Sequence, residues 1–345
     1  MGTTLITGGA GFIGSNFVEL LFERFPHDER IVVLDVFTYA SNPENIPLYV
    51  RESPRFTLLR GDIRDTQVVS EVMATVDRVV HFAAESHVTR SILQDRPFFD
   101  VDVMGTQTIA AAVADNLDRI QRFVHISTSE VYGSARYAPM DEEHPLEPCT
   151  PYAAAKAGAD RLVHAYRKTY GMNTIIIRPF NNYGPKQHPE KVVPRFVTAA
   201  LEGKPLLVHG DGKMTRDWIY VTDTCEAVYR ALVAPSWAHA VGEVINVGTG
   251  IDTSVLTIAE MILDILGKPL SLIRHVAPRP GQVDRHVAST EKARRILLDW
   301  QAEVRLYEGL RRTVSWYKEH PEWWENIEDH VIEITDQKRR LSGSF

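Results

Sequence analysis

The sequence predicts an α/β fold in which helices cover both faces of a parallel sheet. Three observations predict this class. Short apolar, β-branched runs recur through the first half of the chain, stretches with helical spacing separate them, and polar residues rarely interrupt the runs. Strands buried on both faces have this pattern because each side of the sheet packs against helices.

Six segments carry the strand pattern. They are "TTLITGG", "RIVVLDV", "RFTLLRGD", "DRVVHFAA", "RFVHIST" and "NTIIIRP". Helical spacing between them predicts helices at three places: Ser15–Arg24, Val68–Met73 and Val103–Ala114. A fourth helix is expected over Tyr152–Tyr170, because Thr150 can cap it and Pro151 suits its first position.

The pattern changes after residue 180. The stretch "NNYGPKQHPEKVVP" is rich in Pro, Asn and Gly, and "HGDGKMTRDW" indicates a turn followed by a strand. We expect a smaller lobe here, with the chain returning to the large sheet around Trp218–Val247. The polar, basic tail from about Val331 is expected to be loosely held.

Composition narrows the function classes. The chain has 345 residues, 44% hydrophobic and 24% charged, with a formal charge of −7. This is ordinary globular composition for one large or two closely joined domains, and the acidity argues against nucleic acid as the main ligand. The sequence has no apolar run of about 18 residues, so no transmembrane helix is predicted. The start lacks signal-peptide features, and two cysteines, Cys149 and Cys225, favour a reduced cytoplasm.

Glycines between the first strand and helix predict a dinucleotide site. In "LITGGAGFIGSNFVELL", Gly8, Gly11 and Gly14 permit a tight turn, close approach to a pyrophosphate and close helix packing. A glycine-rich turn that binds nothing is the alternative, but Asp35 ends the second strand where a ribose-binding carboxylate belongs. That carboxylate would repel a 2′-phosphate, so this Rossmann-type pattern predicts NAD rather than NADP.

Tyr152 and Lys156 lie four residues apart on one predicted helix, so their side chains share a face. Such a pair alone is typical of an amphipathic surface helix, whereas after a dinucleotide fold it indicates chemistry. A lysine ammonium and an oxidised nicotinamide would both lower the pKa of the tyrosine. Tyr152 could then accept a hydroxyl proton while a hydride leaves the same carbon.

These motifs resemble the extended short-chain dehydrogenase/reductase family, and more narrowly its nucleotide-sugar 4,6-dehydratases, especially the dTDP-glucose branch. The matching stretches run from residue 3 to about Trp324. They include "TYASNPENI", "HFAAESHVTRSI", "STSEVYG", "PYAAAKAGAD", "NNYGPKQHPEKVVP", "GDGKMTRDWIYVTD" and "RPGQVDRH". The resemblance implies a nucleoside-diphosphate sugar as substrate. It also implies a homodimer formed through the helix of Tyr152 and the one near Val103–Ala114.

The resemblance implies a role for each matching position. Thr128 would hydrogen-bond the sugar 4-hydroxyl, and Tyr152 would act as the base, aided by Lys156. The cofactor-binding positions would be Gly8, Gly11, Phe12, Ile13, Gly14, Asp35, Asp62, Ile63, Ala83, Ala84, Ser86, Tyr152 and Lys156. The substrate-binding positions would be His87, Asn181, Lys191, Arg216, Asn246 and Arg285. Cationic and amide donors also suit a diphosphate on physical grounds, and no metal site is implied.

The stretch "STSEVYG" departs from the dTDP-glucose branch, which resembles it except for Asp-Glu in place of Ser129-Glu130. A ketone at C4 acidifies the C5 proton, which Glu130 could remove, and the C6 hydroxyl then needs a proton to leave as water. A serine hydroxyl is too weak an acid to give up its proton outright, but it could orient the leaving hydroxyl or relay a proton. GDP-mannose 4,6-dehydratases carry a similar Thr-Ser-Glu triplet and still eliminate water.

The predicted function is an NAD-dependent 4,6-dehydratase, a lyase, that forms an NDP-4-keto-6-deoxyhexose. UDP-glucuronate decarboxylases share Thr-Ser-Glu, and 4-epimerases often have a small residue at the glutamate position, so both stay open as alternatives. The segment "AAESHVTRSI" favours a dehydratase, although Thr89 replaces the usual aspartate. A non-catalytic dinucleotide sensor is disfavoured because it would not need Thr128, Tyr152 and Lys156 together.

These motifs also divide the predicted fold, a doubly wound parallel sheet with a smaller C-terminal substrate-binding lobe. Residues 1–180 with about 217–248 are expected to form an NAD-binding domain. Residues of about 181–216 with 249–330 are expected to form a nucleotide-sugar lobe, and 331–345 a tail.

Overall fold

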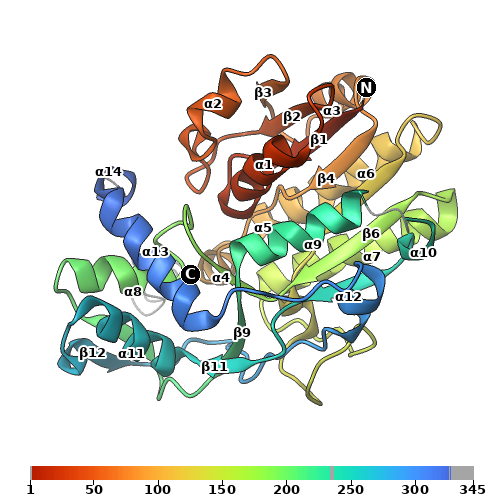
Figure 1. The fold of residues 1–345 in the computed structure, drawn as a ribbon. Helices are drawn as coiled ribbons and strands as arrows, with labels where there is room; N and C mark the ends of the chain where they lie inside the picture. The colour runs from red at the N-terminus through yellow and green to blue at the C-terminus, as the bar shows by residue number, and fades with distance from the viewer. Residues whose placement is uncertain (1, 234–236, 326, 328–345) are drawn as a thin grey trace, which may run out of the picture.

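The computed structural model describes residues 2–233, 237–325 and 327. Its centre is a seven-stranded parallel sheet with the order β10-β6-β5-β4-β1-β2-β3 (Figure 1). The predicted doubly wound parallel sheet is confirmed, and all six expected strands are present in it. The strands are β1 (Thr3–Thr7), β2 (Arg30–Asp35), β3 (Phe56–Arg60), β4 (Arg78–His81), β5 (Arg122–Ile126), β6 (Thr174–Pro179) and β10 (Val244–Val247).

Helices cover both faces of this sheet because successive residues of each strand point to opposite sides. Ile6 of β1 packs in one core with residues of α1, α9 and α12, whereas its neighbour Leu5 packs in the other with α3, α6 and α7. The helices of the first face are α1 (Phe12–Arg24), α9 (Val221–Val233) and α12 (Glu291–Ile296). Those of the second are α3 (Thr66–Met73), α6 (Thr106–Ala114) and α7 (Pro151–Tyr170).

The predicted helix over Tyr152–Tyr170 is present as α7. Thr150 Oγ1 accepts a hydrogen bond from the amide of Ala153 at 3.2 Å, and the helix ends at Gly171 with a φ of +73°. The helix expected over Val103–Ala114 differs at its start. A π-helical turn, η2 (Phe99–Gly105), precedes α6, so the register shifts before the regular helix begins.

A smaller lobe has its own core and two small sheets (Figure 1). One sheet contains β7 (Asn181–Tyr183), β9 (Thr215–Tyr220) and β11 (Asp252–Ser254), and the other β8 (Leu206–His209) and β12 (Ile273–Val276). The helices that enclose this core are α8 (Val192–Leu201), α11 (Val255–Leu266), α13 (Leu306–Glu319) and α14 (Pro321–Trp324). Short helical turns complete the fold: η1 (Pro43–Asn45), α2 (Leu48–Arg51), α4 (Val88–Leu93), α5 (Arg96–Phe98), η3 (Ser129–Tyr132), α10 (Trp237–Ala240) and η4 (Leu270–Leu272).

The chain returns to the large sheet within the expected range, at its far end. Trp218 lies in β9 of the three-stranded sheet, where its indole Nε1 donates to the main-chain oxygen of Thr253 at 2.9 Å. The return is made by α9 and then β10, in which Val244 pairs with Ile176. The division into two domains at the expected boundaries stays a prediction, and residues 331–345 lie outside the described residues. In the part of the chain that is described, no helix is long and apolar enough to cross a membrane.

Candidate active site

The glycine loop after β1 has a shape that only glycine permits. Gly8 has a φ of +68°, and a Cβ placed there would lie 2.6 Å from the amide nitrogen of Ala83. A Cβ at Gly14 would lie 2.2 Å from the main-chain oxygen of Gly8. Gly11 is the N-cap of α1 and supplies no side chain to the amides of the first turn, which Phe12, Ile13 and Gly14 begin. These amides therefore suit a bound phosphate.

Asp35 lies beside this loop at the end of β2 and is buried. Its carboxylate accepts hydrogen bonds from the amides of Ala10 at 3.0 Å and Phe37 at 2.9 Å, and from the hydroxyl of Ser41 at 3.0 Å. These bonds fix the carboxylate next to the amides that suit a phosphate. A dinucleotide site requires a phosphate-binding loop with a ribose-binding carboxylate nearby, and this loop and Asp35 provide both, so the residues present fit NAD.

The other predicted cofactor positions lie along the carboxyl ends of neighbouring strands. Ala83, Ala84 and Ser86 follow β4, which lies next to β1 where the strand order reverses. Ile63 is buried after β3. Asp62 is partly buried and pairs with Arg64, which lowers the pKa of its carboxyl. Its role in cofactor binding stays a prediction.

The triplet predicted to be catalytic, Thr128-Ser129-Glu130, begins two residues after the end of β5. Thr128 Oγ1 caps η3 by accepting a hydrogen bond from the amide of Glu130 at 3.2 Å. Tyr152 is the second residue of α7, and burial raises the pKa of its phenol. The charges of Asp102 and Glu130 raise that pKa further, whereas a hydrogen bond with Thr128 lowers it. The structure thus brings Tyr152, Thr128 and Glu130 together, as the sequence predicted.

Lys156 lies one turn further along α7, and its ammonium is buried. Nζ donates to the main-chain oxygen of Ile126 at 2.9 Å. The groups that shift the Tyr152 pKa in the protein alone do not include Lys156. The lowering expected from this lysine therefore stays a prediction for the cofactor-bound enzyme.

Asp102, in the π-helical turn η2, is a site residue that the sequence analysis missed. Its Oδ1 accepts from the amide of Glu85 at 2.7 Å, and its buried Oδ2 has no hydrogen-bond partner among the described residues. Burial raises the pKa of the Asp102 carboxyl and lowers that of the Lys156 ammonium, and each charge opposes the other's shift. The only sequence signal was the pair of carboxylates, Asp100 and Asp102, inside the otherwise apolar "FFDVDVMG" stretch.

The charge of Glu130 acts on three cations from the second half of the chain. Lys191, Arg216 and Arg279 are shifted by burial toward a lower pKa, and the charge of Glu130 opposes each shift. Arg279 Nε is buried without a hydrogen-bond partner in the described part of the chain, as is Asn181 Oδ1. The sequence predicted Lys191, Arg216 and Asn181 but missed Arg279, which begins the quoted "RPGQVDRH" stretch. The unsatisfied Nε–H of Arg279 and the charges of the three cations suit an anionic diphosphate, to which Asn181 could add the N–H donors of its amide.

The remaining predicted substrate residues have other partners. Arg285 is half exposed, and its Nε pairs with Asp252 at 2.8 Å. Asn246 is buried, accepting from the hydroxyl of Tyr132 at 2.7 Å and donating to a main-chain oxygen. His87 caps α4, and burial lowers its pKa to about 3. The binding roles of these three residues stay predictions.

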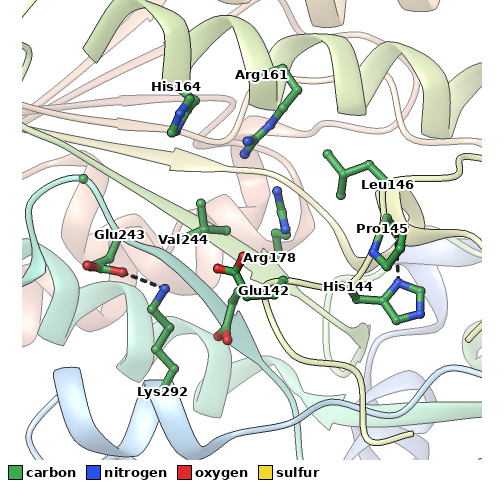
Figure 2. A pocket seen from close by; sticks show the side chains of 12 residues that line it. Glu142, His144, Pro145, Leu146, Arg161, His164, Arg178, Glu243, Val244 and Lys292 are labelled. Carbon is green, nitrogen blue, oxygen red and sulfur yellow. Dashed lines mark hydrogen bonds and ion pairs between the residues drawn. The ribbon is translucent and has the colours of Figure 1, made fainter. Parts of the chain in front are cut away.

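A cavity of about 440 Å³ lies at the β10 edge of the large sheet and contains none of the predicted catalytic residues (Figure 2). Arg161 and His164 point into it from α7, and Lys292 pairs with Glu243 across it. The buried guanidinium of Arg178 connects this cavity to η3, because its Nη1 donates to the hydroxyl of Tyr132 at 2.8 Å. Arg178, which lines this cavity, therefore supports η3, the turn that carries Glu130. Nowhere in the described ranges do three or more His, Cys, Asp or Glu side chains form a group that could hold a metal ion.

Comparison with known proteins agrees with this geometry. The family model described as GDP-mannose 4,6 dehydratase matches residues 5–313. The low-salt glycan biosynthesis protein Agl12 of Haloferax volcanii is 43% identical over 91% of this chain and 97% of its own length. A dTDP-glucose 4,6-dehydratase of Streptomyces niveus is 41% identical over 94% and 95%.

A solved structure is equally similar. DesIV, a dTDP-glucose 4,6-dehydratase from Streptomyces venezuelae crystallised with NAD bound, superimposes with a TM-score of 0.88 at 42% identity, covering 94% of this chain and 99% of that one. The resemblance inferred from the motifs is thereby confirmed. The chain belongs to the GDP-mannose 4,6 dehydratase family, a group of nucleotide-sugar 4,6-dehydratases within the extended short-chain dehydrogenases/reductases.

Proposed function

We propose that this protein is an NAD-dependent nucleotide-sugar 4,6-dehydratase that converts an NDP-hexose to an NDP-4-keto-6-deoxyhexose. One observation carries the proposal. Thr128 accepts a hydrogen bond from the amide of Glu130 at 3.2 Å and also shares a hydrogen bond with Tyr152, so the carboxylate and the phenol meet at one strand end. The charge of Glu130 also acts on Lys191, Arg216 and Arg279. A base for C5 therefore stands beside the base for the 4-hydroxyl, next to a site that suits a diphosphate.

NAD would be held by the glycine loop and by Asp35. When bound, NAD accepts a hydride from the sugar and returns it before the product leaves. The relatives compared above include an enzyme crystallised with NAD, and the glycine loop supports the same cofactor here. Asp35 disfavours NADP because its carboxylate would repel a 2′-phosphate.

Tyr152 would accept the proton of the sugar 4-hydroxyl, and Thr128 would orient that hydroxyl. The two side chains already share a hydrogen bond that lowers the phenol pKa. Lys156 would stabilise the phenolate, because its buried ammonium lies one helical turn away and is fixed by the main chain of β5. A base of this kind contributes about 10²–10⁴-fold to the rate.

Glu130 would remove the C5 proton once C4 is a ketone, and Ser129 would hold the C6 hydroxyl as it leaves. A 4-epimerase needs only the chemistry at C4. The carboxylate of Glu130 supplies a base for C5 that such an enzyme would not need, which favours dehydration over epimerisation. Ser129 is buried beside Glu130 at the start of η3, and its hydroxyl lies 3.5 Å from Nδ1 of His286.

Lys191, Arg216, Arg279 and Asn181 would bind the diphosphate of the substrate. Each supplies a cation or an amide that a diphosphate requires, and two of them have buried polar atoms without a partner among the described residues. dTDP-glucose is the first substrate to test, because relatives about 40% identical carry that specificity in their names.

A homodimer is part of the proposal. Phe99 and Met104 are 41% and 54% exposed on η2, which packs against both α6 and α7. Apolar side chains exposed beside these two helices suit a partner subunit, as the family resemblance implied. We place the protein in the cytoplasm, since Cys149 and Cys225 are both unpaired. Sedimentation of the purified protein tests the dimer.

The function is tested by incubating the protein with dTDP-, UDP-, GDP- and CDP-hexoses and weighing the products. A product lighter by one water supports the dehydratase. Loss of carbon dioxide from UDP-glucuronate indicates a decarboxylase instead, and a new isomer of unchanged mass indicates an epimerase. Binding of NAD without turnover of any sugar nucleotide favours the dinucleotide sensor.

A further inference from the structure

His286 is a buried histidine behind the catalytic triplet that neither the sequence analysis nor the proposed mechanism uses. Its side chain has no solvent exposure. Nε2 lies 2.6 Å from the main-chain oxygen of Gly133, just after η3. On the other side of the ring, Nδ1 lies 3.5 Å from Ser129 Oγ and 4.0 Å from Glu130 Oε1. One ring nitrogen therefore faces both polar side chains of the Ser-Glu pair.

The bond to Gly133 fixes the tautomer of the ring. A carbonyl oxygen only accepts hydrogen bonds, so Nε2 carries the hydrogen, and Nδ1 of the neutral ring is an acceptor. Burial lowers the pKa of His286, the charge of Glu130 opposes this shift, and Arg216 and His144 add to it. At neutral pH the imidazole is neutral, and the hydroxyl of Ser129 donates to Nδ1.

We propose that His286 is the proton relay between Glu130 and Ser129 during water elimination. This inference rests on the proposed dehydratase function and names the route by which the C5 proton reaches the leaving hydroxyl. His286 acts through its two neighbours and does not touch the sugar, so it is a positioning residue.

The relay balances without any co-reactant. The C5–H bond breaks and its proton adds to Glu130, while its electron pair forms the C5=C6 bond and the C6–O bond breaks. The carboxylic acid of Glu130 then gives its proton to Nδ1 of His286. Nδ1 passes a proton to Ser129 Oγ as the hydroxyl hydrogen of Ser129 moves to the departing C6 oxygen, which leaves as water. Glu130, His286 and Ser129 all end in their starting protonation states.

The relay solves a specific chemical difficulty of this chain. Position 129 holds a hydroxyl instead of a carboxylic acid, and a hydroxyl cannot release its proton unless another proton replaces it. Nδ1 is the nearest group that can do so, because it faces Ser129 Oγ and the newly protonated Glu130 alike. The distances of 3.5 Å and 4.0 Å are long, as is common before substrate closes an active site.

The test is His286→Gln, which keeps an N–H donor for the carbonyl of Gly133 but has no titratable Nδ1. We expect the variant to oxidise C4 and to exchange the C5 proton with deuterated solvent at wild-type rates. Water loss should fall about 10²-fold or more, because the proton supply to the leaving group is cut. Ser129→Ala should give the same separation of exchange from elimination, and combining both changes should add little because they interrupt one route.

Two further variants complete the test. Ser129→Asp in the His286→Gln background should restore water loss, because a carboxylic acid at position 129 needs no relay. His164→Gln is the control, since His164 points from α7 into the cavity behind η3, is not among the groups that shift the pKa of His286, and forms no hydrogen bond or ion pair with Ser129 or Glu130 within the described residues. It should leave the ratio of C5 exchange to water loss unchanged.

Three results would overturn the relay. The first is water loss at the wild-type rate in His286→Gln or Ser129→Ala. The second is an equal decline of C4 oxidation, C5 exchange and water loss in His286→Gln. The third is that Ser129→Asp does not restore water loss in the His286→Gln background. Failure of the proposed function looks different, because the wild-type protein would then remove water from none of the sugar nucleotides.

Discussion

The ammonium of Lys156 donates a hydrogen bond to the main-chain oxygen of Ile126, 2.9 Å away. Ile126 is the last residue of β5, and Thr128, Ser129 and Glu130 follow it within four positions. The bond therefore ties the helix that carries Tyr152 to the strand end that carries the other side chains predicted to be catalytic. It holds a buried cation at a fixed place, with one main-chain oxygen as its partner.

Tyr152→Phe should reduce C4 oxidation by about 10²–10⁴-fold while leaving nucleotide binding unchanged. The substitution removes the hydroxyl but keeps the aromatic ring. Rapid-mixing absorbance of the cofactor measures the oxidation, and calorimetry measures binding. Tyr166→Phe is the matched control on the same helix, where the hydroxyl accepts from Gln107 away from the triplet. Full activity in Tyr152→Phe would remove this residue from the mechanism.

Arg216→Gln and Arg279→Gln should each weaken binding of a nucleoside diphosphate by about tenfold or more, because a charge-assisted hydrogen bond contributes about 1.5–3 kcal/mol. Both guanidiniums are largely buried near Glu130, and neither forms an ion pair within the described residues. Titration calorimetry with dTDP and UDP gives the dissociation constants.

Arg285→Gln is the control for those two variants. Its guanidinium pairs with Asp252 at the surface, so we expect less than a twofold change in affinity, on the order of other exposed ion pairs. A loss for Arg285→Gln as large as that for Arg279→Gln would contradict this ranking and favour the role that the family resemblance implied.

Arg279 and Arg285 show what the sequence alone could predict. They are six residues apart in one motif and are chemically identical, so local pattern cannot rank them. The ranking comes from Asp252 on β11, a carboxylate from a distant segment that neutralises only Arg285. The strands of the large sheet, in contrast, were predictable, because a strand buried on both faces is a nearly continuous apolar run in the sequence.

The same distinction applies to Asp102 and His286. The helix around Val103–Ala114 was predicted from its spacing, but the π-helical turn that aims Asp102 inward depends on packing against α7. His286 is brought behind Ser129 from 157 positions away in the chain. The glycine loop, Asp35, Tyr152 and Lys156 were found because their function requires fixed local spacing.

Asp35→Asn should weaken NAD binding by about tenfold and narrow the preference for NAD over NADP. The amide keeps the size of the side chain but loses the charge that favours ribose hydroxyls and repels a 2′-phosphate. Fluorescence titration with both dinucleotides measures the two affinities. Asp62→Asn, at a partly buried carboxylate paired with Arg64, serves as the comparison. An unchanged NADP/NAD ratio in Asp35→Asn would argue against this carboxylate as the discriminator.

Acid should destabilise the fold through two buried histidines beneath the active site. His81 lies between the hydroxyls of Thr7 and Thr106 at 2.6 and 3.0 Å, and His125 has no partner for either ring nitrogen among the described residues. Burial lowers the pKa of His81 to about 3 and that of His125 well below its usual range.

A histidine with a lowered folded-state pKa contributes stability above its unfolded pKa of about 6.5 and loses it as the pH falls. Between about pH 7 and about pH 5, His81 alone should cost about 2 kcal/mol of unfolding free energy. His125→Leu should flatten this loss, whereas His27→Gln, at an exposed position, should not. Urea unfolding at the two pH values measures the slopes, and equal slopes in all three proteins would exclude these histidines as the cause.

Glu130→Gln gives the clearest separation of steps in the proposed reaction. C4 oxidation depends on Tyr152, Lys156 and Thr128, none of which this change removes. Elimination depends on a group that accepts the C5 proton, which an amide cannot do. The variant should therefore form a bound 4-keto sugar and stop before water is lost, with C5 exchange falling by about 10²-fold or more.

Mass spectrometry of quenched single turnovers in deuterated solvent measures both the 4-keto sugar and the C5 label. Glu142→Gln is a suitable control, because its carboxylate bonds to the amide of Asn246 in the cavity behind η3, away from the triplet. Wild-type water loss in Glu130→Gln would contradict the dehydratase mechanism. Retention of full 4-epimerase activity in that variant would instead make epimerisation the better account of this site, because it requires no base at C5.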